Sequence, residues 1–342
     1  MCHFEREKKK ECRKIWIGVS VLLYGKSGLL KKGLKMIRVV GKRGKGSFES
    51  QLDEAAKGLE FEVIDCTSGN PDAMMREGLS PFYLGPVECY DGIKAKVFEL
   101  AWQCAKVYPW CMGSDGLPDS RYFAWRDGQW AREKDLEDTM SMRYPVGKTN
   151  VGKCQYAWWK VDGEFRKLGY VAARKHIYMP LYAKTVVNTA AYKRLVEMRD
   201  SGKNIMLVDF DGYNIHHPRY NFTYNDAVHC PILKMGHGFV LAMLLEGLIR
   251  VEDGEVKFAD GLMDDPKRYY SPDLRKLTEE EKLLRYIKRI GVTMDEYNRL
   301  AQWQRTLLYS VDKAKLEKLG YKKAAWKRLP AEERLRILGG RS

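Results

Sequence analysis

The sequence lacks several features that would place a protein in a class at once. Its eight cysteines include no CxxC pair and no Cys/His spacing that would assemble a zinc site. It has no apolar run long enough to span a bilayer, no internal repeat and no low-complexity segment. Because a chain of 342 residues needs no disulfides for stability, we expect reduced thiols and a cytoplasmic location, meaning the host cytoplasm for a viral protein.

The N-terminal part also lacks a decisive signal. A basic stretch up to Lys14 and an apolar run at 15–24 have the outline of a signal peptide, but no small-residue cleavage site follows. Lysines follow the apolar run instead, and Met36 directly precedes a strand-like segment. We therefore interpret residues 1–35 as a basic extension outside the fold, with Met36 as an alternative natural start.

The composition predicts a globular protein whose charge is unevenly distributed along the chain. Hydrophobic residues make up 45% and aromatic residues 12% of the chain, which excludes intrinsic disorder. The formal net charge of +15 is concentrated at the two ends: residues 1–46 carry 14 Lys/Arg and three Asp/Glu, and residues 267–342 carry 20 and ten. Residues 47–266 carry 26 and 32. The basic flanks suggest nucleic acid, an anionic membrane surface or an acidic substrate as a partner, or in the C-terminal flank a solvated helix face, whereas a central pocket is expected not to be basic overall.

From Met36 onward, short strands alternate with helices, which predicts an α+β fold. Strands are predicted at 37–40, 59–66 and 204–210. Helices are predicted at 48–57, 95–107, 188–198 and 238–248, and a partly helical segment, broken or kinked at Pro180, at 170–185. The glycine-rich segment 41–47 fails the Walker pattern and is interpreted as a flexible basic turn.

A different region begins after Pro266. Charged amphipathic helices are predicted at 278–290, 294–310 and 312–319, separated by Gly291 and Gly320. Trp303 and Trp326 are expected to anchor them, and Thr278 with Glu281 fits a capping box. The predicted organisation is thus an extension at 1–35, a catalytic core at 36–265 that is mainly helical with short strands, and a basic helical appendage at 266–342.

The strongest candidate site lies on the predicted helix at 95–107. Glu99, Gln103 and Lys106 stand at positions i, i+4 and i+7, so they share one helix face. Spacing alone favours a solvent-exposed Glu/Lys face. The preceding apolar loop at 79–86, however, is shaped by Pro and Gly like one wall of a pocket.

Further motifs change this balance. In chain order they are Leu79-Ser-Pro-Phe-Tyr83, Tyr90-Asp-Gly92, Glu99-x-x-x-Gln103-x-x-Lys106, Ile177-Tyr-Met-Pro-Leu-Tyr182, Asn188-Thr189, Leu195-Val-Glu197, Asp209-Phe-Asp-Gly212 and Gly236-His-Gly-Phe-Val-Leu-Ala-Met-Leu-Leu245. Their order, over about residues 75–250, resembles the NADAR superfamily of N-glycosidases that act on ADP-ribose-like and related ribosyl nucleotides. The chain departs from the family pattern at Pro81 and Tyr213, and residues 110–170 look like an insertion, which indicates a divergent, phage-type member.

The resemblance implies an activity and a set of site residues. Glu99 would be the catalytic carboxylate, and Asp209 or Asp211 would hold ribose hydroxyls. The other implied site residues, which orient or bind the substrate, are Ser80, Phe82, Gln103, Lys106, Trp159 (or Trp158), Gly212 and His237. Neither a metal nor a cofactor is expected.

The sequence leaves three functions open. The first is hydrolysis of an N-ribosyl bond in an ADP-ribose-type or modified-nucleotide substrate, including removal of ADP-ribose from nucleic acid bases. The second is glycosyl or nucleotidyl transfer in base hypermodification, which would use the same pocket. The third is a non-enzymatic nucleic-acid-binding protein that uses the basic flanks 1–46 and 267–342.

Overall fold

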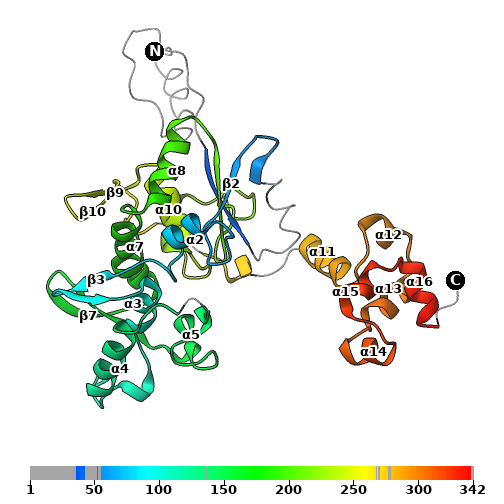
Figure 1. Cartoon of the computed structure of the whole chain (residues 1–342), viewed down its shortest axis with the longest axis horizontal. Helices are drawn as coiled ribbons and strands as arrows, with labels where there is room; N and C mark the ends of the chain where they lie inside the picture. Colours follow the sequence, from blue (N-terminus) through cyan, green and yellow to red (C-terminus); the bar gives the residue numbers. More distant parts are fainter. Residues whose placement is uncertain are drawn as a thin grey trace, which may run out of the picture. The chain divides into compact units, whose positions relative to one another are not determined.

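The computed structural model combines helices with several small sheets (Figure 1). It describes residues 36–42, 52, 55–135, 137–266, 268, 270–275 and 279–339. The described residues form a mixture of helices and several small sheets, which agrees with the predicted α+β class. The extension at 1–35, most of the glycine-rich turn at 41–47, most of the predicted helix at 48–57 and Thr278 of the expected capping box lie outside the described residues.

The described strands form one parallel and three antiparallel sheets. They are β1 (Ile37–Gly41), β2 (Glu62–Asp65), β3 (Val87–Tyr90), β4 (Ile93–Ala95), β5 (Lys106–Val107), β6 (Tyr156–Val161), β7 (Glu164–Leu168), β8 (Ile205–Asp209), β9 (Ile249–Glu252) and β10 (Glu255–Phe258). The parallel sheet has the order β1-β8-β2. The antiparallel sheets are β5-β6-β7, β3-β4 and β9-β10.

Helices make up most of the remaining structure. We call the described residues up to 266 the larger part. Its α-helices are α2 (Ala73–Leu79), α3 (Phe98–Cys104), α4 (Ser120–Trp130), α5 (Thr139–Arg143), α6 (Tyr170–Ala173), α7 (Met179–Val186), α8 (Ala190–Asp200), α9 (Tyr224–His229) and α10 (His237–Leu245). Between them lie the 3-10 helices η1 (Pro109–Cys111) and η2 (Val151–Lys153) and the π-helix η3 (Arg174–Tyr178). The 3-10 helix η4 (Pro272–Arg275) follows.

The parallel sheet and α10 form the centre of the larger part. All five residues of β8 are buried, as expected for the central strand of a parallel sheet. All nine residues of α10 are buried too, and the helix packs against β1 and β8. Because β1, β2 and β8 are parallel, their carboxyl ends lie at the same edge, where loops of α/β sheets commonly bind ligands.

The helix predicted at 95–107 is wrong at both ends. Ala95 ends β4, and Lys106 and Val107 form β5, so the helix is limited to α3. The hydroxyl of Tyr122 donates hydrogen bonds to the carbonyl oxygens of Cys104 and Ala105, at 3.1 and 3.3 Å. Residues 106 and 107 then pair with β6. Tertiary contacts thus override local helix propensity at this point.

The segment predicted to be broken or kinked at Pro180 is not broken there and continues as a helix. α6, η3 and α7 follow one another without a gap. Pro180 lies in the first turn of α7, directly after the π-helical turn. The missing N–H of proline falls where the regular i→i−4 ladder is already altered, so the break is avoided.

The other strands and helices predicted in this part, where the structure describes them, agree with it apart from small differences at element ends. The strands predicted at 37–40 and 204–210 correspond to β1 and β8, and the one at 59–66 is shortened to β2. The helices predicted at 188–198 and 238–248 correspond to α8 and α10.

The C-terminal part is a set of short helices with its own core. They are α11 (Glu279–Ile290), α12 (Met294–Arg299), α13 (Gln302–Tyr309), α14 (Lys313–Lys318), α15 (Lys323–Arg328) and α16 (Ala331–Ile337). Its core is formed by Ile290, Leu300, Leu308, Ala331 and Leu335.

Two details of the C-terminal part differ from the sequence predictions. The helix predicted at 294–310 is split into α12 and α13, because Leu300 and Ala301 are extended. Trp326 is buried as predicted, at 4% exposure, but Trp303 is 50% exposed and anchors nothing in the core. Gly291 and Gly320 end their helices with φ of 71° and 76°, a conformation that favours glycine.

Candidate active site

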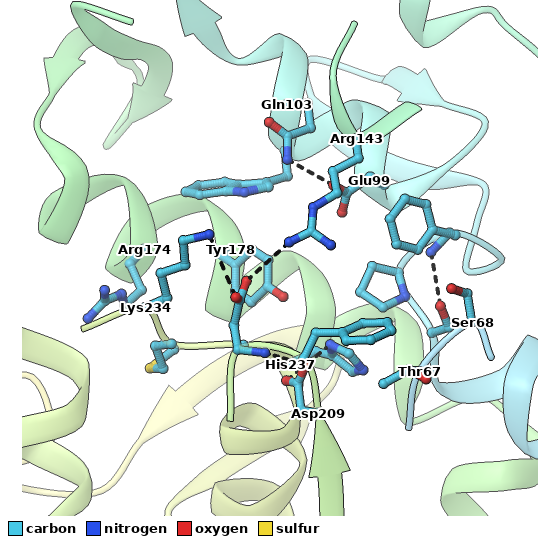
Figure 2. A pocket seen from close by; sticks show the side chains of 18 of the residues that line it. Thr67, Ser68, Glu99, Gln103, Arg143, Arg174, Tyr178, Asp209, Lys234 and His237 are labelled. Atoms are coloured by element: carbon cyan, nitrogen blue, oxygen red, sulfur yellow. Dashed lines mark hydrogen bonds and ion pairs between the residues drawn. The ribbon is translucent and has the colours of Figure 1, made fainter. Parts of the chain in front are cut away.

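A cavity of about 280 Å³ lies at the carboxyl ends of β2 and β8 (Figure 2). Thr67 and Ser68 line it just after β2, and Asp209 lines it at the end of β8. Further walls come from the loop that joins α2 to β3, and from the helices α3, α5 and η3. The cavity thus gathers segments from residue 67 to residue 237 of the chain.

Glu99 lies in the first turn of α3 and is only 7% exposed. Its backbone N–H donates to the carbonyl oxygen of Pro81, at 3.0 Å. Its carboxylate accepts a hydrogen bond of 2.8 Å from Nε2 of Gln103, one helical turn later. Burial raises the pKa of Glu99, and the hydrogen bond from Gln103 and the positive charges of Lys106 and Arg143 oppose this shift. The site therefore holds a desolvated carboxyl group in a fixed orientation.

Lys106 joins the same network although it lies beyond the helix. Its Nζ donates to Oε1 of Gln103 and lies 4.9 Å from the centroid of the Trp102 ring. Burial lowers the pKa of Lys106, while the charge of Glu99 acts in the opposite direction. The predicted trio thus comes together, with Gln103 between the acid and the base.

Asp209 and His237 are held by backbone groups. Oδ2 of Asp209 accepts a hydrogen bond of 2.8 Å from the N–H of Gly238, in the first turn of α10, and lies 3.3 Å from Nδ1 of His237. His237 Nε2 lies 2.8 Å from the carbonyl oxygen of Cys66, to which it must donate. A Cβ placed on Gly236 would lie 2.0 Å from Oδ2 of Asp209. Asp209 therefore fixes the start of α10 on the sheet.

Asp211 has a different environment. Its side chain is 34% exposed, against 3% for Asp209. Its carboxylate lies 3.7 Å from Nη2 of Arg143 and 3.7 Å from Nζ of Lys234, so two cations from segments far apart in the sequence lie close to it. Of the two candidate aspartates, Asp211 is the more accessible and Asp209 the more constrained.

The other predicted site residues divide into two groups. Ser80 and Phe82 line the cavity, and Oγ of Ser80 accepts a hydrogen bond from the N–H of Phe82. Gly212 is not among the lining residues, and a Cβ there would lie 2.4 Å from the carbonyl oxygen of Val40 in β1. Gly212 thus allows two backbone segments to approach closely.

The tryptophans that the resemblance implies as substrate-binding residues lie elsewhere. Trp159 is 3% exposed, and its ring meets those of Tyr90 and Trp130 edge to face, with centroids 4.8 and 6.0 Å apart. Trp158 stacks on Phe165. Neither lines the cavity. The aromatic residues that do so are Phe82, Trp102, Tyr144, Tyr170, Tyr178 and Phe210.

Several lining residues were missed by sequence reasoning. Arg143 and Tyr144 come from the segment interpreted as an insertion, and Lys234 precedes α10. Arg174, from η3, is almost fully buried, and its guanidinium donates to the carbonyl oxygens of residues 227, 228, 230 and 233. It thereby fixes the segment that carries Lys234. No motif marks these positions, although a π-helical turn often accompanies a functional site.

Comparison with protein-family models, with curated proteins and with solved structures finds no match for this chain. Among the residues that the structure describes, no group of three His, Cys, Asp or Glu side chains is placed to hold a metal ion. No helix within the described ranges is both long enough and apolar enough to cross a membrane.

Proposed function

We propose that the protein is a NADAR-like N-glycosidase that hydrolyses an N-ribosyl bond in an ADP-ribose-type or modified-nucleotide substrate. The observation that carries the proposal is the environment of Glu99. It is a buried carboxylate, oriented by Gln103, in a cavity that also presents cations and aromatic rings. This arrangement agrees with the role that the resemblance assigns to Glu99.

A carboxylate at this position suits the proposed chemistry. As the bond between C1′ and nitrogen breaks, its electron pair leaves on nitrogen and positive charge develops at C1′. An ionised Glu99 stabilises that charge, which is worth most in a desolvated site. The oxygen of a water molecule then bonds to C1′ while Glu99 accepts its proton. In this mechanism Gln103 acts as a positioning residue, because it holds one carboxylate oxygen.

The substrate class follows from the rest of the lining. Lys106, Arg143 and Lys234 line the cavity together with Glu99, Asp209 and Asp211, and these three cations suit the phosphates of a nucleotide. The rings of Trp102 and Phe82 line the cavity, and aromatic rings in such a site can stack on a base or a nicotinamide-like group. The combination supports a ribosyl nucleotide over a neutral sugar.

The Glu99→Gln variant tests the proposal. It preserves the shape of the side chain and an acceptor for Gln103 but removes the charge. We expect unchanged circular dichroism and a loss of at least about 100-fold in product release. Glu164→Gln, on the exposed strand β7, is the matched control and should retain full activity.

The assay uses a panel of ADP-ribose conjugates, including ADP-ribosylated DNA, in water labelled with heavy oxygen, with mass spectrometry of the products. Hydrolysis places the label on C1′, whereas transfer places an acceptor there. Full activity of Glu99→Gln, or no release from any conjugate by the wild-type protein, would contradict the assignment.

A further inference from the structure

The C-terminal part contains a second recess, far in the sequence from the candidate active site. It has a volume of about 830 Å³ and lies between the end of α11, α14 and the start of α15. We call it the lysine groove. Its charged lining residues are Lys288, Arg289, Lys313, Lys322, Lys323, Lys327, Asp312 and Glu317.

The two acidic residues already serve the protein itself. Oδ1 of Asp312 accepts a hydrogen bond of 2.8 Å from the N–H of Lys315 and so caps α14. Glu317 lies 3.6 Å from Nζ of Lys313, one turn away on the same helix. Neither carboxylate neutralises the opposite side of the groove.

The positive charges of the other four lysines of the groove are not balanced by nearby carboxylates of the described residues. Lys288, Lys322, Lys323 and Lys327 form no ion pair with any residue that the structure describes. Lys327 is half-buried, and its Nζ donates to the carbonyl oxygen of Lys288, at 2.6 Å. Burial and the positive charges of Lys323, Arg334 and Lys288 lower the pKa of Lys327. Mutual repulsion in this cluster would be relieved by an anion.

We propose that the lysine groove binds the sugar–phosphate backbone of nucleic acid. All but one of its cations are lysines, which act as point charges toward phosphate and lack the fork geometry of arginine that reads base edges. The guanidinium of Arg289, the one arginine among the lining residues, lies over the ring of Tyr309, 3.9 Å from its centroid. A concave surface fits a phosphate-bearing ridge better than a flat bilayer. Of its apolar lining residues, Leu316 is buried and Val311 and Tyr321 are half-buried, so the groove offers a membrane no fully exposed apolar anchor. Binding is therefore independent of base sequence.

The inference does not depend on the proposed function. It assigns the nucleic-acid contact predicted for the basic flank 267–342 to one surface, the lysine groove. This surface is expected to bring the protein to a polyanion whether or not the core is an N-glycosidase. A core without N-glycosidase activity would leave the groove intact, and a groove variant should still cleave a small nucleotide conjugate. The two proposals can therefore fail separately.

The test measures binding of the full-length protein to a labelled DNA duplex of about two helical turns, by fluorescence anisotropy over a series of salt concentrations. Each lysine–phosphate contact contributes about 0.9 to the slope of log affinity against log salt. The double variant Lys322→Gln/Lys323→Gln should weaken binding and reduce the slope by about 1.8. It leaves the contact between Lys327 and Lys288 in place, and circular dichroism checks its fold.

The matched control removes two positive charges from the same part of the chain but outside the groove. Lys318→Gln/Arg336→Gln changes the net charge equally, at exposed positions that do not line it. It should leave the slope nearly unchanged. Single-stranded DNA and vesicles of anionic lipid complete the series, and binding to either form of DNA supports the proposal.

Three outcomes would overturn the proposal. Equal weakening by both double variants would show that only net charge matters. Unchanged binding by the groove variant would place the contact elsewhere. Binding to anionic vesicles but not to DNA would assign the groove to another partner.

Discussion

Replacement of Gly236 by alanine should destabilise the protein through one steric conflict. Gly236 precedes α10 with φ of −88°, so its backbone conformation is open to any residue. The added Cβ, however, would lie 2.0 Å from Oδ2 of Asp209, far inside contact distance. Asp209 must therefore move, and its hydrogen bond to the N–H of Gly238 must lengthen or break.

The magnitude follows from that bond. A hydrogen bond to a charged group contributes about 1.5 to 3 kcal/mol, and the displaced carboxylate stays buried, so we expect Gly236→Ala to cost about 2 to 3 kcal/mol. For a domain of about 150 to 250 residues this corresponds to a decrease in Tm of roughly 5 to 10 °C. Because Asp209 also lies 3.3 Å from His237, the same shift would disturb one wall of the cavity.

Urea denaturation followed by tryptophan fluorescence, together with thermal melts, would measure the loss. Gly128→Ala is the control, because Gly128 lies inside α4 and a Cβ added there would meet no heavy atom within 4 Å. It should be neutral or more stable by up to about 1 kcal/mol, since alanine is the better helix former. Wild-type stability of Gly236→Ala would refute the conclusion that Asp209 fixes the start of α10.

Two further predictions concern the cavity and the core. Lys106→Met removes a charge that lowers the pKa of Glu99, so that pKa should rise further. In the proposed mechanism Glu99 acts as a carboxylate, so the acid limb of the kcat/KM profile should move to higher pH. Lys234→Met should raise KM without moving that limb, and an unchanged limb in Lys106→Met would contradict the coupling between Lys106 and Glu99. Trp159→Leu should lower the free energy of unfolding in urea by about 2 to 4 kcal/mol and leave KM unchanged, because Trp159 is buried away from the cavity. Trp102→Leu should raise KM, because Trp102 lines the cavity. The reverse pattern would show that Trp159 binds the substrate.

The parts of the fold that the sequence predicts best are those fixed by local pattern. The apolar runs of β8 and α10 are buried over their full length, so their hydrophobicity alone indicates them. Gly291 and Gly320 end helices because a left-handed residue is needed there. The spacing of Glu99 and Gln103 likewise predicts their contact, since i and i+4 are neighbours on any helix.

Features that depend on distant segments escape such reasoning. The end of α3 is decided by the Tyr122 hydroxyl and by pairing with β6, neither of which local propensity reports. Arg143 and Lys234 come from segments far apart in the sequence and meet only across the folded cavity. Trp159 is a large aromatic next to another, and the sequence does not tell which neighbours surround it.

Asp211 has one further consequence for which molecules the cavity accepts. Its carboxylate already lies close to the positive charges of Arg143 and Lys234, so it competes with any anionic ligand for these two side chains. A monocarboxylate that displaced it would only exchange one such contact for another and gain little. A diphosphate, with more charge and more acceptor oxygens, would gain from both cations at once. The cavity would then discriminate against small organic acids because Asp211 competes with them for Arg143 and Lys234, and not because of the shape of the cavity walls.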